Sequence, residues 1–434
     1  MQKARSSSFL VSLVATFIIS IPLFGQFNTY SPYTRFGLGD MAKQGIGQNQ
    51  AMGGTGLAIH QNNRINYLNP ASFSALDSTS VYFDFGANTF YNQYQSEDYS
   101  NRWWNMNLHH VAFASSVGKY MGFSAGIVPY SSIGYNIKQE YNDYTNGLAM
   151  DTYFEGEGGI MNFYMGTSIK LLDRFSVGVT MNFLMGKLTR NRAVEFPMNS
   201  SYSNITSTEN MDMRKPVFTL GLQYKEVFDD RFFFSLGGVY DFKASTELSN
   251  EYMVNNEFYT GKATWLNDSV QIDPVYILGA DTAFNTLNIP QRVGLGLAFG
   301  IPNKLTITGD YYMQDWTGSM SGENYATTKA SSMHFGAEYI PEAEALRGYH
   351  KLISYRVGGY YSNSYLMVNE YQLEDYGITF GVGLPVKTLK SSINLAFTLG
   401  TRGTTEYNLV KENYGIVTFN VTLHDLWFRK RRFD

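Results

Sequence analysis

The sequence has no cysteine and little charge. None of its 434 residues is Cys, which excludes disulfides, thiolate metal sites and a lipid-modified N-terminal Cys. Lys, Arg, Asp and Glu together make up 16% of the chain, well below the roughly 25% of soluble domains. The formal net charge of -4 gives no electrostatic reason to expect a nucleic-acid partner.

Long hydrophobic runs are also scarce. Lys3 and Arg5 precede an apolar run over residues 9–24, which is followed by the small residue Gly25. This order is typical of a secretory signal peptide and predicts removal of residues 1–25. A transmembrane anchor is the alternative, but the run is short and polar sequence follows it at once. No later window approaches the roughly 20 unbroken apolar residues of a spanning helix.

The sequence is rich in residues that favour strands. It contains 33 Tyr, 31 Phe and 41 Gly, and aromatic side chains are enriched in β-strands. Long stretches alternate between apolar and polar residues, which places one set on each face of a strand. The clearest of these stretches are 175–185, 305–314, 393–400 and 417–423. We therefore expect strands along most of the chain after about residue 78.

Strand and loop lengths favour a membrane barrel. The alternating stretches run for roughly 10 to 14 residues, and a tilted transmembrane strand needs about 9–11. Short links fit periplasmic turns and lie at 171–174, 228–231, 301–304 and 386–390. Long polar links fit extracellular loops and lie at 91–105, 138–155, 191–212, 247–288, 317–330 and 363–371. These features predict an all-β, transmembrane antiparallel barrel of about 14 strands over residues 78–424. A secreted β-sandwich, the alternative, would have shorter strands and no such sorting of loops.

One segment before the strands is too broken for a helix and too rich in Gly for an ordinary strand. Its Gly53-Gly54-Thr55-Gly56 and Asn69-Pro70-Ala71 motifs resemble the N-terminal plug of the FadL (OMPP/FadL/TodX) family of outer-membrane channels. Segments 122–134, 289–316 and 334–361 are similar to further strands of that family, in the same order. The resemblance therefore covers most of the mature chain.

The resemblance implies a fourteen-stranded barrel in the Gram-negative outer membrane, with residues 26–77 as a hatch inside the lumen. It further implies passive transport of long-chain fatty acids or other hydrophobic molecules, so the expected partners are such a ligand and outer-membrane lipids. Segment 31–40 resembles a divergent branch found in Bacteroidota, some members of which are subunits of secretion or assembly machines. A non-transporting barrel subunit of such a complex, bound to outer-membrane or periplasmic proteins, is therefore the alternative function.

The plug motifs have a physical rationale. Backbone that is neither helix nor strand needs local hydrogen-bond partners when it is buried. An Asx-turn at Asn69 and a fixed φ at Pro70 supply such a turn, and glycines allow positive φ and close approach to the wall. The candidate plug and gate residues are Gly53, Gly54, Gly56, Asn69, Pro70 and Ala71. The alternative is a packed turn with no gating role.

Pro129 predicts a break in the wall. It lies within an alternating stretch, and a proline there removes a ladder hydrogen bond. We expect a lateral gap for a hydrophobic ligand near Pro129 and Gly134, bordered by the turn at 69–71. In the alternative, the proline lies at the extracellular rim, outside the membrane zone.

Three charged residues lie on lumen-facing positions of neighbouring stretches: Asp310, Glu338 and Arg356. They predict an internal polar network that satisfies buried charge. Electrostatic selection of a substrate is the alternative role for this network.

The sequence gives little support for a catalytic site, and we expect no enzymatic activity, no cofactor and no metal. Residues 122–126 match G-x-S-x-G, but that motif requires a strand-to-helix turn with a downstream acid and His. His109 and His110 are adjacent and are predicted to face opposite sides of a strand, so they would not converge on a metal.

The chain ends in a basic segment. Residues 425–434 contain Arg429-Lys430-Arg431-Arg432, which an even number of strands places in the periplasm. This tail is predicted to meet lipid headgroups or, alternatively, to be a docking site for a partner.

Overall fold

The structure is a computed structural model. It describes residues 30–427 apart from 97–99, 144–147, 197–203, 230, 258–264, 267–268, 271–275, 323–324 and 387–389. The predicted signal peptide and the basic run at 429–432 lie outside the described residues, as do residues 258–264, 267–268 and 271–275 of the predicted loop at 247–288.

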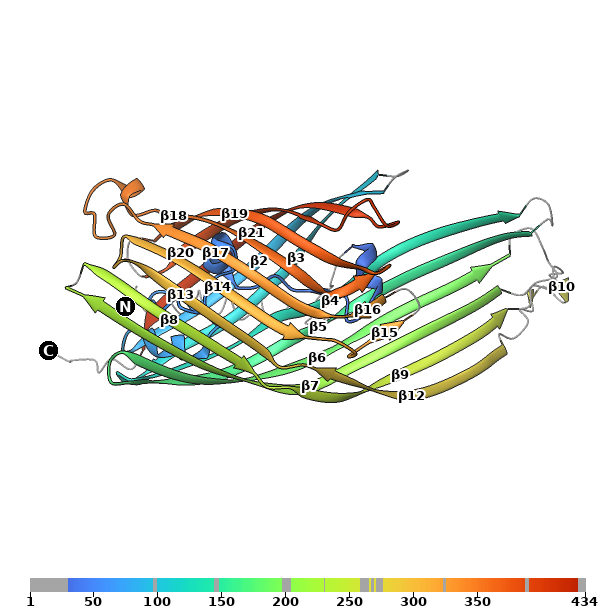
Figure 1. The fold of residues 1–434 in the computed structure, drawn as a ribbon, viewed down its shortest axis with the longest axis horizontal. Helices are drawn as coiled ribbons and strands as arrows, with labels where there is room; N and C mark the ends of the chain where they lie inside the picture. The colour runs from blue at the N-terminus through green and yellow to red at the C-terminus, as the bar shows by residue number, and fades with distance from the viewer. Residues whose placement is uncertain are drawn as a thin grey trace.

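A closed antiparallel barrel of 14 strands forms the molecule, as predicted (Figure 1). Each strand pairs with the next around the ring, and β21 pairs with β2 to close it. The strands are β2 (Ser80–Gln95), β3 (Ser100–Val117), β4 (Met121–Asp143), β5 (Leu148–Leu171), β6 (Phe175–Glu195), β7 (Asn204–Phe228), β8 (Phe232–Asp241), β13 (Arg292–Ile301), β14 (Leu305–Asp315), β17 (Lys329–Tyr339), β18 (Ser354–Val368), β19 (Tyr371–Pro385), β20 (Ser392–Arg402) and β21 (Lys411–Leu426).

One side of the barrel is taller than the other. Strands β9 (Ala244–Glu257) and β12 (Tyr276–Ile289) continue β8 and β13, pair with each other and extend the wall beside β7. Together with the long strands β4 to β7 they project beyond the rest of the ring (Figure 1). The remaining strands are short. Strand β1 (Asp40–Met41) pairs with the middle of β4. The other four lie in connections between wall strands: β10 (Trp265–Leu266), β11 (Ser269–Val270), β15 (Ser321–Gly322) and β16 (Tyr325–Thr327).

The two ends of the barrel differ in their connections. Three predicted short links are tight turns at one end, which we call the short-turn end. In the turn at 302–304, for example, Asn303 adopts φ 58°, a left-handed conformation that Asn tolerates. A longer connection at the same end, 340–353, carries the 3-10 helix η4 (Tyr349–Lys351). We call the opposite end, where β4 to β7 project, the long-strand end.

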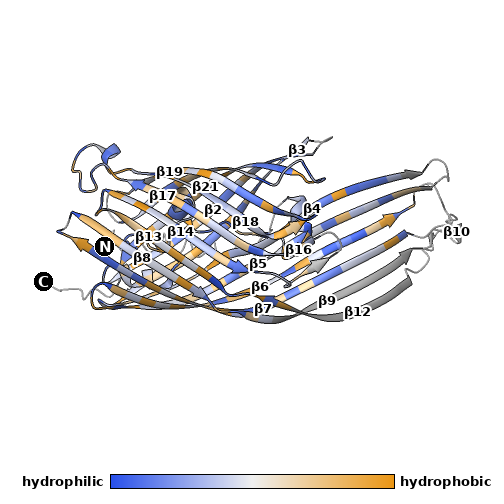
Figure 2. Cartoon of the chain, in the orientation of Figure 1, coloured by the Kyte–Doolittle hydropathy of each residue, from blue (hydrophilic) through white to orange (hydrophobic). Residues whose placement is uncertain are grey.

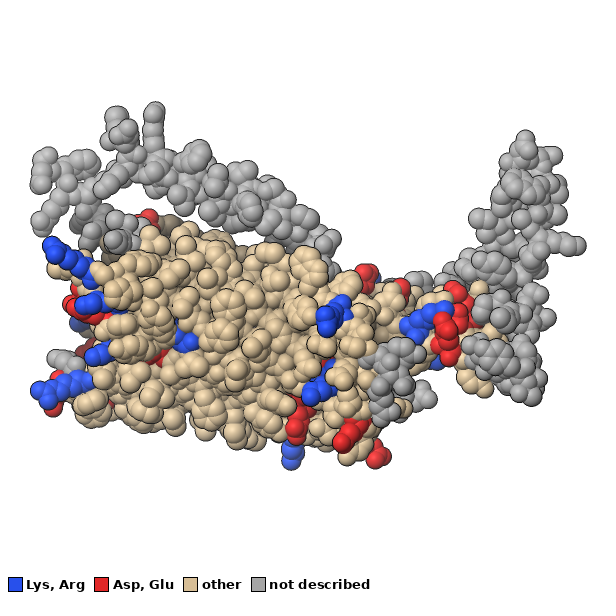
Figure 3. All heavy atoms as spheres, turned by 90° about the horizontal axis from the view of Figure 1, so that it is seen from above, with Lys and Arg blue, Asp and Glu red and all other residues tan. Residues whose placement is uncertain are grey.

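The alternation of residues sets the two faces of the wall. Along β13, for example, the outward-pointing side chains are at least half exposed: Leu295 (63%), Leu297 (52%) and Phe299 (50%). The intervening Gly294, Gly296 and Ala298 face the lumen. The hydropathy colouring repeats this pattern around the wall (Figure 2). On the face seen in Figure 3, charged side chains gather near the ends and are sparse on the middle band, as expected of a surface that faces lipid.

Residues 30–76, which we call the N-terminal segment, lie within the ring of strands. The 3-10 helix η2 (Gly47–Met52) contacts β17 to β21 and β2, whereas η3 (Pro70–Ala75) contacts β3 to β7 on the opposite side. A segment that touches both sides of a closed ring occupies its interior. A third 3-10 helix, η1 (Pro32–Arg35), lies nearer the long-strand end and contacts β4 (Figure 1). We call residues 44–76 the lower half of the segment and residues 30–43 its upper half.

Candidate functional site: the N-terminal segment and the parted wall

Glycines seat the lower half of the segment against the wall. Helix η2 ends at Gly53, which has φ 68°, and Gly54 follows with φ 86°. A Cβ atom on Gly53 would lie 2.5 Å from the carbonyl oxygen of Gly359, so only glycine fits. Its own N–H donates to Oγ1 of Thr379 (2.8 Å), and its carbonyl oxygen accepts from Nδ1 of His334 (2.6 Å). Gly56 is crowded within the segment itself, because a Cβ there would lie 2.6 Å from Cδ1 of Leu68.

Asn69, Pro70 and Ala71 begin helix η3. The Asn69 side chain accepts from the N–H of Ala71 (3.0 Å) and donates to the carbonyl oxygens of Leu57 (2.8 Å) and Leu222 (3.1 Å). It thereby caps the helix and ties the turn to β7, while Pro70 occupies the first turn, where its missing N–H costs least. This turn lies against Gly178 of β6 and Gly221 of β7. The expectation that it borders Pro129 is therefore wrong.

A buried ion-pair cluster joins the lower half of the segment to the barrel. Nε of Arg356 in β18 donates to Glu338 in β17 (2.6 Å). Nη2 of Arg64 in the segment donates to both carboxylate oxygens of Glu338 (2.7 and 2.8 Å). All three side chains are almost fully buried (3–4% exposed). Removing one partner from such a buried group costs about 3–5 kcal/mol, because it leaves charge without compensation.

Asp310 does not join that cluster, contrary to the prediction. Its Oδ2 atom accepts the backbone N–H groups of Gly56 (2.7 Å) and Leu57 (2.9 Å) instead. Asp310 lies on β14 opposite His334, whereas Glu338 lies opposite Thr306, four residues before Asp310 in β14. The carboxylate thus satisfies two donors of the irregular segment, which have no strand or helix partner.

A second group of ion pairs holds the upper half of the segment. Arg402 of β20 contacts Asp40 (2.5 Å) and also Glu412 of β21 (2.5 Å), whose other oxygen accepts from Oγ of Ser31 (2.5 Å). Lys43 pairs with Asp375 of β19. Asp40 and Lys43 remain about one third exposed (31% and 30%), so water screens these pairs more than the Glu338 cluster.

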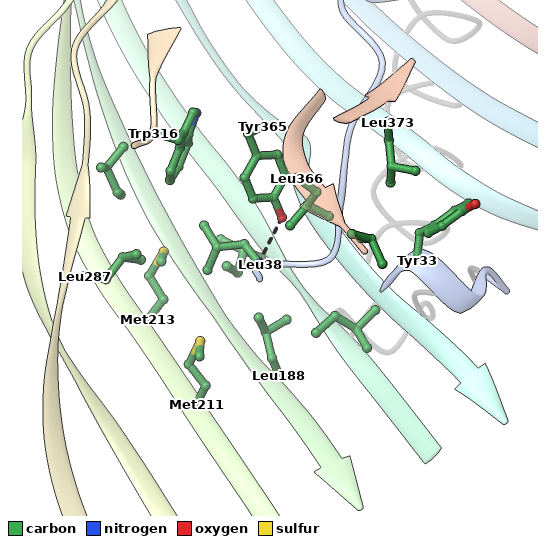
Figure 4. Close-up of a cluster of buried hydrophobic side chains, with 14 of the residues drawn as sticks. Tyr33, Leu38, Leu188, Met211, Met213, Leu287, Trp316, Tyr365, Leu366 and Leu373 are labelled. Atoms are coloured by element: carbon green, nitrogen blue, oxygen red, sulfur yellow. Dashed lines mark hydrogen bonds between the residues drawn. The ribbon is translucent and has the colours of Figure 1, made fainter. Parts of the chain in front are cut away.

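An apolar cluster packs around the same half. Tyr33 and Leu38 of the segment lie among side chains from the tall strands and from the opposite rim (Figure 4). The N–H of Leu38 donates to the hydroxyl of Tyr365 (3.0 Å), which itself donates to the carbonyl oxygen of Gly39 (2.8 Å). Members of the cluster outside the segment include Leu188, Met211, Met213, Leu287, Trp316, Leu366 and Leu373.

The barrel wall parts beside Pro129. Among the described residues, β3 pairs with β4 only from Val117–Met121 to Val111–Ile127. Strand β4 continues to pair with β5 up to Asp143, with a register shift between Pro129 and Ser131. Pro129 thus lies two residues beyond Ile127, the last residue of β4 that pairs with β3.

The upper half of the segment fills the space beside β4. Strand β1 pairs with β4 through Asp40–Ser132 and Met41–Ser131, and the N–H of Ala42 donates to the carbonyl oxygen of Tyr130 (2.9 Å). Further along, the N–H of Ser31 donates to the carbonyl oxygen of Gly134 (2.8 Å). These bonds provide partners for backbone groups on the edge of β4. Nearer the short-turn end, β3 pairs with that edge instead.

Two cavities remain around the segment. The first, of about 300 Å³, lies between the upper half and the wall; it is lined by Pro129, Tyr130, Lys43, Arg292, Asp375 and Arg402, among others. The second, of about 390 Å³, lies between residues 58–63 and the short turns, beside Lys170 and Lys225. Burial lowers the pKa of His60, at the edge of the second cavity, to about 4, so this imidazole is neutral at pH 7. Neither cavity is lined by apolar groups alone.

Comparison with known proteins decides the family. The profile of a family described as BamG matches residues 8–434. The chain belongs to the BamG family. This name differs from that of the FadL family, whose resemblance the sequence suggested. No curated protein matches the chain significantly.

The fold of this BamG-family protein is nevertheless that of FadL-type channels. A Pseudomonas aeruginosa FadL homologue superposes with a TM-score of 0.58 at 12% identity, covering 89% of this chain and 99% of its own. The toluene transporter TodX of P. putida gives 0.55 at 15% identity, covering 90% and 100%. The toluene transporter TbuX of Ralstonia pickettii gives 0.55 at 14% identity, covering 88% and 98%. At such identities the likeness establishes the fold of an outer-membrane barrel and nothing finer.

The two adjacent histidines of the BamG-family barrel correct a prediction. A register shift between β2 and β3 at Gly86 and Ala87 leaves His109 out of the ladder, so both rings turn inward and their Nδ1 atoms lie 2.9 Å apart. His110 also contacts Asp84 (2.5 Å). A bulge of this kind breaks the period of two that the prediction assumed. Within the described ranges, no group of three or more His, Asp or Glu side chains could hold a metal ion.

The G-x-S-x-G match lies within strand β4, not at a strand-to-helix turn. Oγ of Ser124 donates to the carbonyl oxygen of Phe113 (2.9 Å) in the neighbouring strand. The solved neighbours TodX and TbuX are transporters rather than enzymes. In the described part of the chain, no helix is long and apolar enough to cross a membrane.

Proposed function

We propose that this BamG-family protein is a closed barrel of the Gram-negative outer membrane that acts as a non-transporting subunit of an outer-membrane assembly complex. The observation that carries the proposal is the filled lumen: residues 31–76 are bound to strands all around the ring. Short turns would face the periplasm and the tall strands the exterior, as in other outer-membrane barrels.

The manner of binding supports a permanent seal. The lower half of the segment could leave only by breaking the Arg64–Glu338 pair and the two bonds to Asp310. Both are buried, so the charges would lose their partners before water could replace them. We propose on this basis that the lower half of the predicted plug at 26–77 is fixed, with Gly53, Gly54, Gly56 and the turn at 69–71 as seating residues rather than gate residues.

The cavities support the same choice. Binding sites for small apolar ligands are mostly apolar pockets of roughly 300–1,000 Å³. The cavity beside Pro129 is at the lower limit of this range, about 300 Å³, and its largely apolar lining is interrupted by charged side chains such as Arg292, Asp375 and Arg402. These charged groups are already paired with one another or with neighbouring carboxylates, and an acyl chain that lay against them would offer them no hydrogen bond.

The tall wall and the chain end supply surfaces for partners in this proposal. Strands β4 to β7, β9 and β12 extend past the other strands, and the predicted basic tail at 425–434 would lie at the periplasmic side. Membership of the Bacteroidota branch, suggested by segment 31–40, is consistent with this role and is part of the same proposal.

Transport of a hydrophobic small molecule is the second candidate, and the parted wall favours it. A ligand in the cavity beside Pro129 would lie next to the place where β3 and β4 separate. Release between Pro129 and Gly134 would then require the upper half of the segment to leave the edge of β4. The fold shared with TodX and TbuX agrees with this route.

Purification in mild detergent, with quantitative mass spectrometry of both proteins and lipids, tests the two candidates together. Stoichiometric protein partners, combined with no uptake of a hydrophobic dye by liposomes that contain the purified barrel, are expected for the subunit. Bound fatty acid without partners, together with dye uptake, would reject the subunit and favour the channel. A variant that deletes residues 30–76 gives a positive control for dye uptake, because it removes the segment that fills the lumen.

A further inference from the structure

A lysine without an acidic partner lies in the cavity at the short-turn end. Lys225 of β7 lines this cavity beside residues 58–63 of the lower half. Its Nζ atom donates to the carbonyl oxygen of His60 (2.9 Å) and lies 5.3 Å from the centre of the Phe233 ring. In the described part of the chain, no carboxylate forms an ion pair with Lys225. An ammonium group has three N–H donors, so two of them are left for a ligand.

The cavity carries an excess of positive charge. Of the carboxylates that line it, Glu338 and Asp77 are already paired with cations, and Asp173 is 75% exposed. Lys170 of β5 also lines the cavity, 3.7 Å from Asp173, and Lys304 is an exposed part of the lining. A concave site in which cations outnumber free carboxylates attracts anions.

Lys225 and Lys170 act on one place in the cavity. The imidazole of His60 lies there, with its Nδ1 atom 2.9 Å from Oε1 of Gln223. Burial lowers the pKa of His60, and the charges of Lys225 and Lys170 lower it further. Because a positive charge lowers the pKa of a neighbouring histidine, both lysines lie near His60 although they come from different strands. An anion beside His60 would therefore be attracted by both.

A buried hydroxyl beside Lys225 lacks a hydrogen-bond partner. Ser235 of β8 lies directly opposite Lys225 in the ladder, which places the two side chains on the same face with Cβ atoms about 5 Å apart. Oγ of Ser235 is buried in the lining of the cavity and has no partner among the described residues. Buried polar atoms are nearly always hydrogen-bonded, so this hydroxyl points to a ligand that the chain itself does not supply.

The chemistry of these groups favours phosphate. A phosphate monoester carries nearly two negative charges and three acceptor oxygens, enough for two lysines and a hydroxyl, whereas a carboxylate carries one charge. The volume of about 390 Å³ lies within the range of small-ligand sites, roughly 300–1,000 Å³. We propose that this cavity binds inorganic phosphate or a phosphate monoester, with Lys225 and Ser235 as direct donors and Lys170 as a further charge. The site goes beyond the proposed function and does not depend on which end of the barrel faces outward.

Calorimetric titration of the full-length protein in detergent micelles with inorganic phosphate tests the site. Sodium chloride at equal ionic strength is the control for the ion. We expect saturable binding that Lys225→Met weakens by about tenfold or more and that Lys225→Arg largely retains, because hydrogen bonds to charged groups are the strong ones. Ser235→Ala, which removes one hydroxyl, should weaken binding by about fivefold. The matched control is Lys351→Met, since Lys351 is 46% exposed and pairs with Glu342; it should bind phosphate as the wild type does.

A second titration distinguishes the two sources of a phosphate group. Phosphatidic acid, whose phosphate is also a monoester, is added to the micelles, and bound lipid is counted by native mass spectrometry for the wild type and for Lys225→Met. Binding of inorganic phosphate that depends on Lys225 supports the proposal with a free anion as the ligand. Binding of phosphatidic acid alone, equally dependent on Lys225, supports it with a lipid headgroup as the ligand.

Three results would overturn the proposal: binding of neither probe, equal binding by the wild type and Lys225→Met, or the same heat with chloride as with phosphate. Lys225→Met removes no ion pair, so the variant is expected to fold, and circular dichroism checks this. If it does not fold, Ser235→Ala decides, because unchanged affinity in that variant would reject the site. None of these results bears on protein partners, so failure of the phosphate site leaves the proposed subunit role intact.

Discussion

The two halves of the N-terminal segment are held in the same barrel by different forces. Charges and backbone donors that are removed from water fix the lower half: Arg64 on Glu338, and two N–H groups on Asp310. The upper half has main-chain pairing with one strand edge, an apolar cluster, and the partly exposed ion pairs of Asp40 and Lys43.

Because of this difference, we expect the lower half to seal the lumen and the upper half to be able to move. Buried charges without partners cost several kcal/mol, so the lower half is expected to stay seated whenever the barrel is folded. The pairs that Asp40 and Lys43 form are each worth about 1 kcal/mol or less, because water reaches about a third of these two side chains. The upper half can therefore leave the edge of β4 while the lower half still closes the lumen.

The largest effect is expected from the buried cluster. Glu338→Gln keeps the size of the side chain but leaves two buried guanidinium groups facing a neutral amide. We expect a loss of about 3–5 kcal/mol in the free energy of unfolding, measured by urea titration in micelles. The control is Glu342→Gln, since Glu342 is 56% exposed and pairs with Lys351 at the surface. Equal effects of the two variants would contradict the comparison.

A wall glycine should rank next. A Cβ atom on Gly237 of β8 would lie 1.9 Å from the carbonyl oxygen of Leu57, whereas on the adjacent Gly238 it would meet nothing closer than 3.7 Å. Gly237→Ala is expected to cost about 1–3 kcal/mol through overpacking of the lower half, and Gly238→Ala almost nothing. The same titration measures both, and a destabilising Gly238→Ala would show that the wall rather than the plug is sensitive.

The cap of η3 should have a smaller effect. Asn69→Ala removes the acceptor of the Ala71 N–H and the donor to Leu57 and Leu222, and loss of such a cap costs about 1–2 kcal/mol. Asn69→Ser keeps a capping oxygen and is expected to recover part of the loss. If serine recovered nothing, the bonds of the amide to the wall, rather than the cap, would be the important ones.

The sequence predicted the regularly alternating strands and missed the irregular features of the barrel. Alternation with a period of two is enough to find β6, β14 and β20, and it places Glu338 and Arg356 on lumen-facing positions of neighbouring strands. The same assumption failed at His109, where a bulge shifts the register without any signal in the residues themselves. The extension of the wall by β9 and β12 falls in a polar stretch, 247–288, that reads as a loop.

The contacts of the N-terminal segment were the hardest to predict. Arg64 binds Glu338, and Asp310 binds the N–H of Gly56, both across more than 250 residues of sequence. The segment has no periodicity that would indicate which of its side chains contact the wall. Its glycines and its Asn-Pro-Ala turn could be found because each needs a special backbone. Which strands they touch depends on the closed barrel, so the turn at 69–71 was expected beside Pro129 but packs on β6 and β7.

A variant in the upper half should have the smallest effect on stability, and it gives the most direct test of whether the two halves move separately. Lys43→Met removes the pair with Asp375 and is expected to lower the free energy of unfolding by no more than about 1 kcal/mol. Amide hydrogen exchange should nevertheless speed up at residues 31–42, which are bound to the edge of β4, and stay slow at residues 53–57. Lys304→Met, in an exposed turn, should change neither region. If exchange rose equally in both regions of the Lys43→Met variant, the two halves would open as one unit, and the upper half could not act as a separate insert.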